Sequence, residues 1–169
     1  TISKSLPLNC GTVIVKHANP CGVSIKKNDL ESYKSALSCD PTSAFGGIVS
    51  CNFKIKKKLA LELNKIFLEV VIANGFENDA LKILKSKKNL RIIDAKNFAL
   101  NEIIKFNPTN EAILTQSEDL AKFNINNFRI VSKKKPNKNQ LNNLIFAMNV
   151  CRYVKSNAIV LASDETTVG

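Results

Sequence analysis

The feature that most constrains the fold of this 169-residue chain is a short apolar run near its start that ends abruptly in polar residues. Residues 12–15 are four consecutive β-branched residues, which are stiff at χ1 and favour a buried strand. Lys16 and His17 follow at once, and the Asn, Pro and Gly in segment 19–22 predict a turn. We therefore expect a strand that delivers a charged pair to a loop at its carboxyl end, where α/β sheets commonly bind ligands.

His17 is the only histidine in the sequence, so chemistry that needs an imidazole near neutral pH has this one candidate. A lysine beside it favours the neutral imidazole, which can accept a proton. The ammonium group of Lys16 can stabilise negative charge that develops on a carbonyl oxygen. The alternatives are a structural histidine and a solvated lysine at a strand end.

The remaining apolar segments alternate between strand-like and helix-like patterns, which predicts an α/β protein with helices packed on a mixed or largely parallel sheet. Strands are predicted at residues 12–15, 48–49, 67–73, 90–93 and 158–162. Helices are predicted at residues 29–39, 56–66, 79–85 and 141–151. Weaker signals favour strands at 98–106 and 128–132.

Two of the predicted helices have well-defined apolar faces. Asp29 is expected to cap the helix at 29–39. The apolar face of that helix consists of Leu30, Tyr33, Ala36 and Leu37. The helix at 141–151 is expected to be amphipathic, with an apolar face made of Leu141, Leu144, Ile145, Met148 and Cys151.

Two further segments supply candidate ligand contacts. Phe45, Gly46 and Gly47 predict a tight turn in which the main chain can approach a ligand closely and the phenyl ring offers a flat apolar face; a simple turn is the alternative. Glu69 lies in the apolar run 67–73, where a buried carboxylate is costly unless it is paired or used. The alternative places Glu69 at the exposed start of this strand.

Five segments of the sequence match the motifs of one known family. They are K-H-A-N-P-C-G-V at 16–23, C-D-P-T-S-A-F-G-G-I-V at 39–49, F-L-E-V-V-I-A at 67–73, K-K-N-L-R at 87–91 and V-K-S-N-A-I-V at 154–160. In order and spacing they resemble the AICAR transformylase domain of the bifunctional purine biosynthesis (AICAR formyltransferase/IMP cyclohydrolase) family. Together they are far more specific than a lone glycine motif.

The resemblance implies formyl transfer from 10-formyltetrahydrofolate, as co-substrate, to the 5-amino group of AICAR. It assigns His17 as the proton acceptor, and Lys16 and Asn157 as groups that stabilise the transition state. It also assigns Phe45, Gly46 and Glu69 to substrate binding. The same resemblance implies a homodimer, whose full chain carries IMP cyclohydrolase on a separate domain.

The fold implied by the resemblance is a cytidine-deaminase-like layered α/β fold, with a mixed sheet flanked by helices and without the zinc site. Residues 1–96 would form the first deaminase-like subdomain. Residues 97–169 would form a connecting segment and the start of the second subdomain. The chain is therefore interpreted as an internal fragment.

Three other functions compete with this interpretation. Zinc deaminases need H-x-E and P-C-x-x-C, whereas this chain has His17-Ala18-Asn19 and lacks the second cysteine after Cys21, so no metal site is expected. A Cys21 nucleophile with His17 as its base is disfavoured because no third orienting residue is visible. A non-catalytic nucleotide-binding module is the alternative that the sequence leaves open.

The composition limits the partners and the compartment. The net charge is +11, but 22 of the 25 basic residues are lysine, whereas nucleic-acid recognition relies on arginine and stacking aromatics. We therefore expect no nucleic-acid partner and interpret the lysine runs 56–58 and 133–135 as solvated faces. No apolar run is long enough to cross a membrane, and five cysteines without C-x-x-C spacing fit a reducing cytoplasm.

Overall fold

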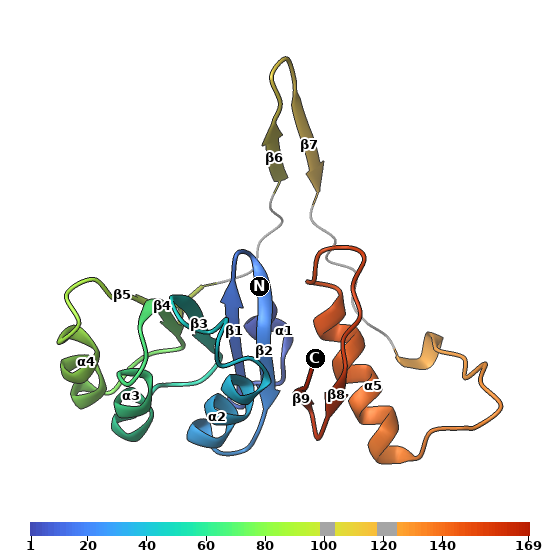
Figure 1. Cartoon of the computed structure of the whole chain (residues 1–169), viewed down its shortest axis with the longest axis horizontal. Coiled ribbons are helices and arrows are strands. Elements are labelled where there is room, and N and C mark those ends of the chain that lie inside the picture. Colours follow the sequence, from blue (N-terminus) through green and yellow to red (C-terminus); the bar gives the residue numbers. More distant parts are fainter. Residues whose placement is uncertain (99–103, 118–124) are drawn as a thin grey trace.

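The computed structural model describes residues 1–98, 104–117 and 125–169. Its centre is a mixed seven-stranded sheet with the strand order β5-β4-β3-β1-β2-β9-β8 (Figure 1). The strands of this sheet are β1 (Gly11–Lys16), β2 (Asn19–Ile25), β3 (Gly47–Cys51), β4 (Leu68–Ala73), β5 (Arg91–Asp94), β8 (Ala162–Ser163) and β9 (Thr166–Thr167). The helices are α1 (Ile2–Ser5), α2 (Asp29–Cys39), α3 (Lys57–Leu63), α4 (Asn78–Lys85) and α5 (Lys138–Cys151), with a short 3-10 turn, η1, at Ile125–Asn127.

Helices cover both faces of the sheet. Ile14 of β1 belongs to the larger core, which is shared with α2, α3 and α4. Its neighbour Val13 points to the opposite face and packs in a second cluster with Phe146 and Val150 of α5. Because successive strand residues face opposite sides, the β-branched run is buried on both faces, as expected. The predicted α/β class with a mixed, helix-flanked sheet is confirmed, and the cytidine-deaminase-like layering stays a prediction.

The predicted turn at 19–22 is wrong, because these residues begin β2, the second strand of a hairpin with β1. Pro20 pairs with Val15 where the register shifts between Ile14 and Val15, and bulges are positions where a sheet tolerates proline. At Gly22 an added Cβ would lie 2.0 Å from the carbonyl oxygen of Ala36. Pro20 and Gly22 favour a turn in the sequence, but here they have other roles. Pro20 lies at a bulge, and Gly22 allows β2 to approach α2 closely.

The segments from residue 28 to residue 94 otherwise agree with the predictions, within a few residues at their ends. The cap of α2 is Asn28, whose side chain accepts hydrogen bonds from the backbone N–H groups of Leu30 and Glu31, so the cap lies one residue before the predicted Asp29. Tyr33 and Ala36 are fully buried, which confirms the predicted apolar face of this helix.

Helix α5 is confirmed, but its buried face differs from the prediction. Phe146 and Val150 reach the sheet, whereas Leu144 is 57% exposed and Met148 is 47% exposed. The predicted apolar face instead lines a groove of about 310 Å³ together with residues 128–132, for which the expected strand is not formed. Phe128, Ile130 and Val131 thus border this groove and are largely exposed.

The predicted strand at 158–162 is also mostly wrong. Only Ala162 and Ser163 are in a strand, β8, which turns back into β9. Thr166 of β9 pairs with Ser24 of β2, and their hydroxyl groups are 2.8 Å apart. Because β9 takes the position beside β2, residues 158–161 remain outside the sheet.

A separate two-stranded sheet is formed by β6 (Ile104–Pro108) and β7 (Ile113–Ser117), with pairs from Ile104↔Ser117 to Pro108↔Ile113. Residues 104–106 of the predicted strand at 98–106 are therefore in β6, whereas residues 99–103 lie outside the described residues. The proposed subdomain boundary at residues 96 and 97 stays a prediction.

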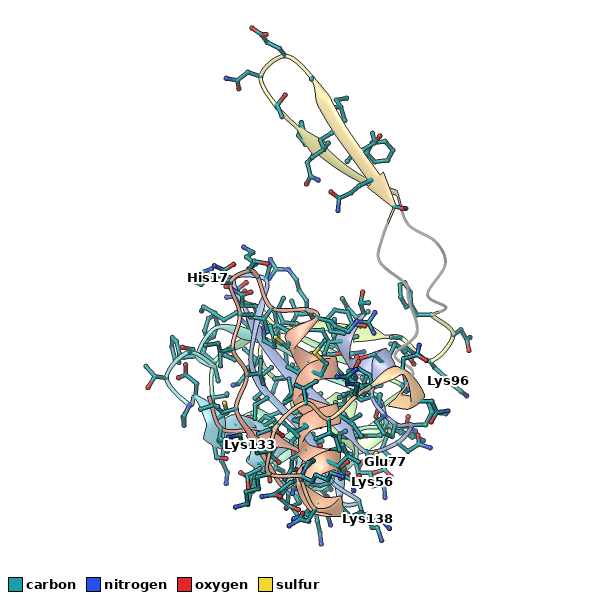
Figure 2. The ribbon with its side chains drawn as sticks, turned by 90° about the vertical axis from the view of Figure 1, so that its right-hand side faces the viewer. His17, Lys56, Glu77, Lys96, Lys133 and Lys138 are labelled. Atoms are coloured by element: carbon teal, nitrogen blue, oxygen red, sulfur yellow. The ribbon has the colours of Figure 1, made fainter. Side chains whose placement is uncertain are left out.

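The surface of the described part of the chain is strongly basic. Both lysine runs, 56–58 and 133–135, are exposed, and Lys56, Lys133 and Lys138 lie on the outside of the molecule (Figure 2). In the described ranges, no helix combines the length and the apolar character that crossing a membrane requires.

Candidate active site

The candidate residues gather at one end of the sheet, where β1 ends and β3 and β4 begin; we call this the site end. β1 runs antiparallel to β3, and β3 runs parallel to β4. Lys16 at the end of β1 therefore lies near Phe45 and Gly46, which precede β3. Glu69, the second residue of β4, lies at the same end of the sheet. The candidate residues thus lie at the carboxyl end of β1 and at the amino ends of β3 and β4.

Lys16 makes a direct contact with the second motif. Its Nζ donates a hydrogen bond of 2.6 Å to the carbonyl oxygen of Phe45. The next residue, Gly46, has φ +68°, and a Cβ added there would lie 2.8 Å from the same Nζ. Glycine at this position thus avoids both a strained backbone and a collision with the ammonium group.

Phe45 is 62% exposed and is supported by a residue that the sequence did not indicate. The rings of Phe45 and Phe67 have centroids 5.4 Å apart and are tilted by 47°. The backbone N–H of Gly46 donates to the carbonyl oxygen of Phe67 at 2.8 Å. Phe67 is the first residue of the strand predicted at 67–73, but nothing in the sequence pairs it with Phe45.

His17 occupies the tip of the β1–β2 hairpin (Figure 2). Its φ is +52° and that of Ala18 is +64°, and two successive positive values define the type I′ turns that match the twist of a hairpin. Histidine is among the residues that adopt this conformation more readily than most. The imidazole is exposed and is therefore accessible to a substrate at the site end.

Asn157 lies in the exposed loop after α5, and this loop reaches the same hairpin. The backbone N–H of Lys155 donates to Oδ1 of Asn19 at 3.2 Å. His17 and Asn157 are each two residues from this hydrogen bond. The structure therefore brings the segment of Asn157 to the hairpin tip, although it is 140 residues away in the sequence.

Glu69 follows the alternative interpretation. Leu68 is buried, but Glu69 is exposed at the start of β4. The cost of a buried carboxylate therefore does not apply to Glu69, and burial gives no reason to expect a partner or a function for it. Its assignment to substrate binding stays a prediction that rests on the resemblance.

A cavity of about 330 Å³ lies between β2, the end of α2 and the loop after α5. Its lining includes Cys21, Cys39, Asp40, Ile159 and Thr167. Burial, together with the nearby charge of Asp40, raises the pKa of the Cys21 thiol, which reduces the fraction of reactive thiolate. Hydrogen bonds from Ser43 lower the pKa of the Asp40 carboxyl.

These results further disfavour a Cys21 nucleophile. Among the described residues, no three His, Cys, Asp or Glu side chains are grouped so that they could hold a metal ion.

Comparison with known proteins gives a consistent result. Residues 2–169 match the family described as the AICARFT/IMPCHase bienzyme. Proteins named bifunctional purine biosynthesis protein PurH are similar to this chain. The one from Clostridium kluyveri is 49% identical over 154 residues, covering 90% of this chain and 30% of the relative. The one from Thermoanaerobacter sp. strain X514 is 47% identical over 157 residues, covering 93% and 31%.

The relative from Brachyspira hyodysenteriae is 44% identical over 150 residues, covering 89% of this chain and 29% of the relative. The chain therefore spans about 30% of the length of the curated relatives that it matches.

Proposed function

Because the chain belongs to the AICARFT/IMPCHase bienzyme family, we propose that it carries part of an active site for formyl transfer from 10-formyltetrahydrofolate to the 5-amino group of AICAR. The observation that carries the proposal is the hydrogen bond from Lys16 Nζ to the Phe45 carbonyl oxygen. It joins two of the family motifs at the site end, beside the accessible imidazole of His17.

The reaction needs a base and a group that stabilises an oxyanion. The amine nitrogen of AICAR forms a bond to the formyl carbon, and its proton passes to the imidazole of His17. The formyl oxygen becomes negatively charged in the tetrahedral intermediate. Collapse of this intermediate breaks the bond to the folate nitrogen, which takes up a proton as it leaves. An aromatic amine is a weak nucleophile, so both kinds of assistance lower the barrier.

Lys16 and Asn157 are the proposed stabilising groups. A lysine ammonium group has three N–H donors, and the hydrogen bond to Phe45 uses one of them. Two donors remain for the developing oxyanion. The amide of Asn157 can donate without changing its protonation state, and its loop is held next to the hairpin through Lys155 and Asn19.

Phe45, Gly46 and Glu69 are proposed substrate contacts. The N–H of Gly46 already donates to Phe67, so a contact from Gly46 would use its α-carbon surface or its carbonyl oxygen. Phe45 offers an exposed ring, which suits the flat heterocycles of both substrates. We also place the reaction in the cytoplasm and in a homodimer with a deaminase-like fold, and IMP cyclohydrolase on a part of the protein outside these residues.

The test is an assay of the protein at its full natural length with AICAR and 10-formyltetrahydrofolate. We expect formyl-AICAR and tetrahydrofolate to form in equal amounts. Binding of AICAR without turnover, in protein that is folded and dimeric, would instead favour the alternative of a non-catalytic nucleotide-binding module.

A further inference from the structure

Phe67 is a partly exposed aromatic residue at the site end to which neither the resemblance nor the comparisons assign a role. It directly precedes β4 and is 44% exposed. A phenyl ring in this position contributes less to the core than a fully buried one. Its contacts are made instead with the turn that carries Phe45 and Gly46.

Two contacts and one close approach connect Phe67 to this turn. Its ring packs against the Phe45 ring, with 5.4 Å between the centroids. Its carbonyl oxygen accepts the Gly46 N–H at 2.8 Å. Its Cε1 and Cδ1 atoms lie 3.4 Å and 3.5 Å from the position that a Cβ on Gly46 would occupy. The ring therefore covers Gly46 as well as the side of Phe45.

The same empty Cβ position of Gly46 lies 2.8 Å from Lys16 Nζ. The ammonium group of Lys16 and the Phe67 ring thus both border the space that a side chain at position 46 would occupy. Lys16 Nζ is held by the Phe45 carbonyl oxygen, and the direction of that carbonyl depends on the conformation of the turn. The hydrogen bonds from Gly47 N–H to the Ala44 carbonyl and from Gly46 N–H to the Phe67 carbonyl fix the backbone of this turn.

We infer that Phe67 is a positioning residue, whose ring holds the Phe45 ring and the turn so that the Phe45 carbonyl oxygen keeps Lys16 Nζ at the site end. The inference rests on the proposed function only for its effect on catalysis. Its geometric part concerns Lys16, Phe45 and Phe67 alone. The contact is specific to the side chain, since any residue at position 67 keeps the backbone carbonyl that accepts the Gly46 N–H.

The experiment compares Phe67→Ala and Phe67→Tyr with the wild type in the protein at its full natural length. The matched control is Phe98→Ala, which removes another exposed phenyl ring. Phe98 follows the carboxyl end of β5, and because β5 runs parallel to β4, this is the end of the sheet opposite the site end. Tyrosine keeps the ring, so Phe67→Tyr should restore whatever Phe67→Ala loses.

The first readout is the rate at which an amine-reactive reagent modifies Lys16, followed by peptide mass spectrometry. Phe67→Ala should release Lys16 and raise this rate at least about twofold, while Phe67→Tyr and Phe98→Ala should not. The second readout is kcat/KM for formyl transfer. Phe67→Ala should lower it by about 2- to 12-fold, the range that an aromatic pair contact supports, with a melting temperature close to that of the wild type.

The outcomes separate the two proposals. An inactive wild-type protein in which Phe67→Ala still raises the modification rate of Lys16 would reject formyl transfer and retain the positioning role. An unchanged Lys16 rate in Phe67→Ala would overturn the positioning role whatever the activity. A lower melting temperature with unchanged Lys16 modification and unchanged kcat/KM would show that Phe67 only stabilises the fold.

Discussion

The two parts of the candidate site are anchored in different ways. Lys16, Phe45 and Gly46 lie at the ends of paired strands and are joined by a side-chain hydrogen bond and a close backbone approach. Asn157 lies in an exposed loop after α5, and its segment is tied to the hairpin through the Lys155 N–H. The strand part is held by the sheet itself, whereas the position of the loop part depends on a polar contact at the surface.

This difference shows that residues from the same set of family motifs need not be held with equal rigidity. A residue at a strand end inherits the precision of the strand ladder. A residue in a loop needs an additional tether, and such tethers are individually weak because they compete with water. Substitutions in the two parts should therefore differ in how strongly their effect on activity depends on backbone geometry.

The largest expected effect is at His17, in the turn that directly follows Lys16 of the strand part. In the protein at its full natural length, His17→Ala should lower kcat by about 10²- to 10⁴-fold, because loss of a general base typically costs this much. The KM for AICAR should change much less, since a base acts mainly in the transition state. Steady-state kinetics would measure both values, and a nearly unchanged kcat would return His17 to a structural role.

The next effect is on the loop part, at Asn157. Asn157→Ala should lower kcat by about 10²- to 10³-fold if its amide donates to the oxyanion. Asn157→Asp is the matched variant, because it keeps the size but removes the N–H donors and should be no better than alanine. If the aspartate variant kept most of the activity, Asn157 would not be an oxyanion donor.

Gly46→Ala tests how strongly the strand part depends on backbone geometry. The positive φ and the proximity of Lys16 Nζ should lower the free energy of unfolding by about 1 to 3 kcal/mol and also displace the ammonium group. The control is Gly75→Ala, at φ +103°, where an added Cβ would lie 3.6 Å from Cγ of Lys54, an ordinary contact distance. Chemical denaturation should show a lower free energy of unfolding for both variants, whereas kcat/KM at 25 °C should fall for Gly46→Ala alone.

The smallest expected effect is on the tether of the loop. Asn19→Ala removes the acceptor for the Lys155 N–H and should lower kcat/KM by about 2- to 12-fold, as expected for one hydrogen bond worth about 0.5 to 1.5 kcal/mol. In the Asn157→Ala background, Asn19→Ala should lower kcat/KM hardly any further, because Asn19 and Asn157 act as a unit. Full additivity in this double-mutant cycle would contradict a role for Asn19 in placing Asn157.

The sequence predicted most helices and strands in the first 98 residues, because their apolar periodicity is clear. It failed at β2, where Pro20 and Gly22 favour a turn unless the bulge and the contact with Ala36 are known. It also did not predict which side of α5 is buried. This helix has apolar side chains on two sides, and those that pack with Val13 of the sheet are Phe146 and Val150. Tertiary packing decided both cases.

The family was predictable from five short motifs and is confirmed by the match of residues 2–169. The meeting of Lys16 with Phe45 was not predictable from spacing, because it depends on the antiparallel pairing of β1 with β3. Phe67 was missed because its contact with Phe45 depends on the parallel pairing of β3 with β4. A motif indicates which residues matter together, whereas the strand order indicates which of their neighbours support them.

The closing pair of the hairpin has a consequence for how this chain can change in length. Lys16 and Asn19 face each other across the two-residue tip, and each reaches a different part of the site, through Phe45 and through Lys155. Inserting or deleting one residue between them would break this closing pair, and a register slip of one residue would also reverse the side chains of one strand relative to the other. Surface loops usually accept such insertions, but here an insertion would disconnect one of the two parts. A protein engineer should therefore exchange this tip only as a unit of fixed length.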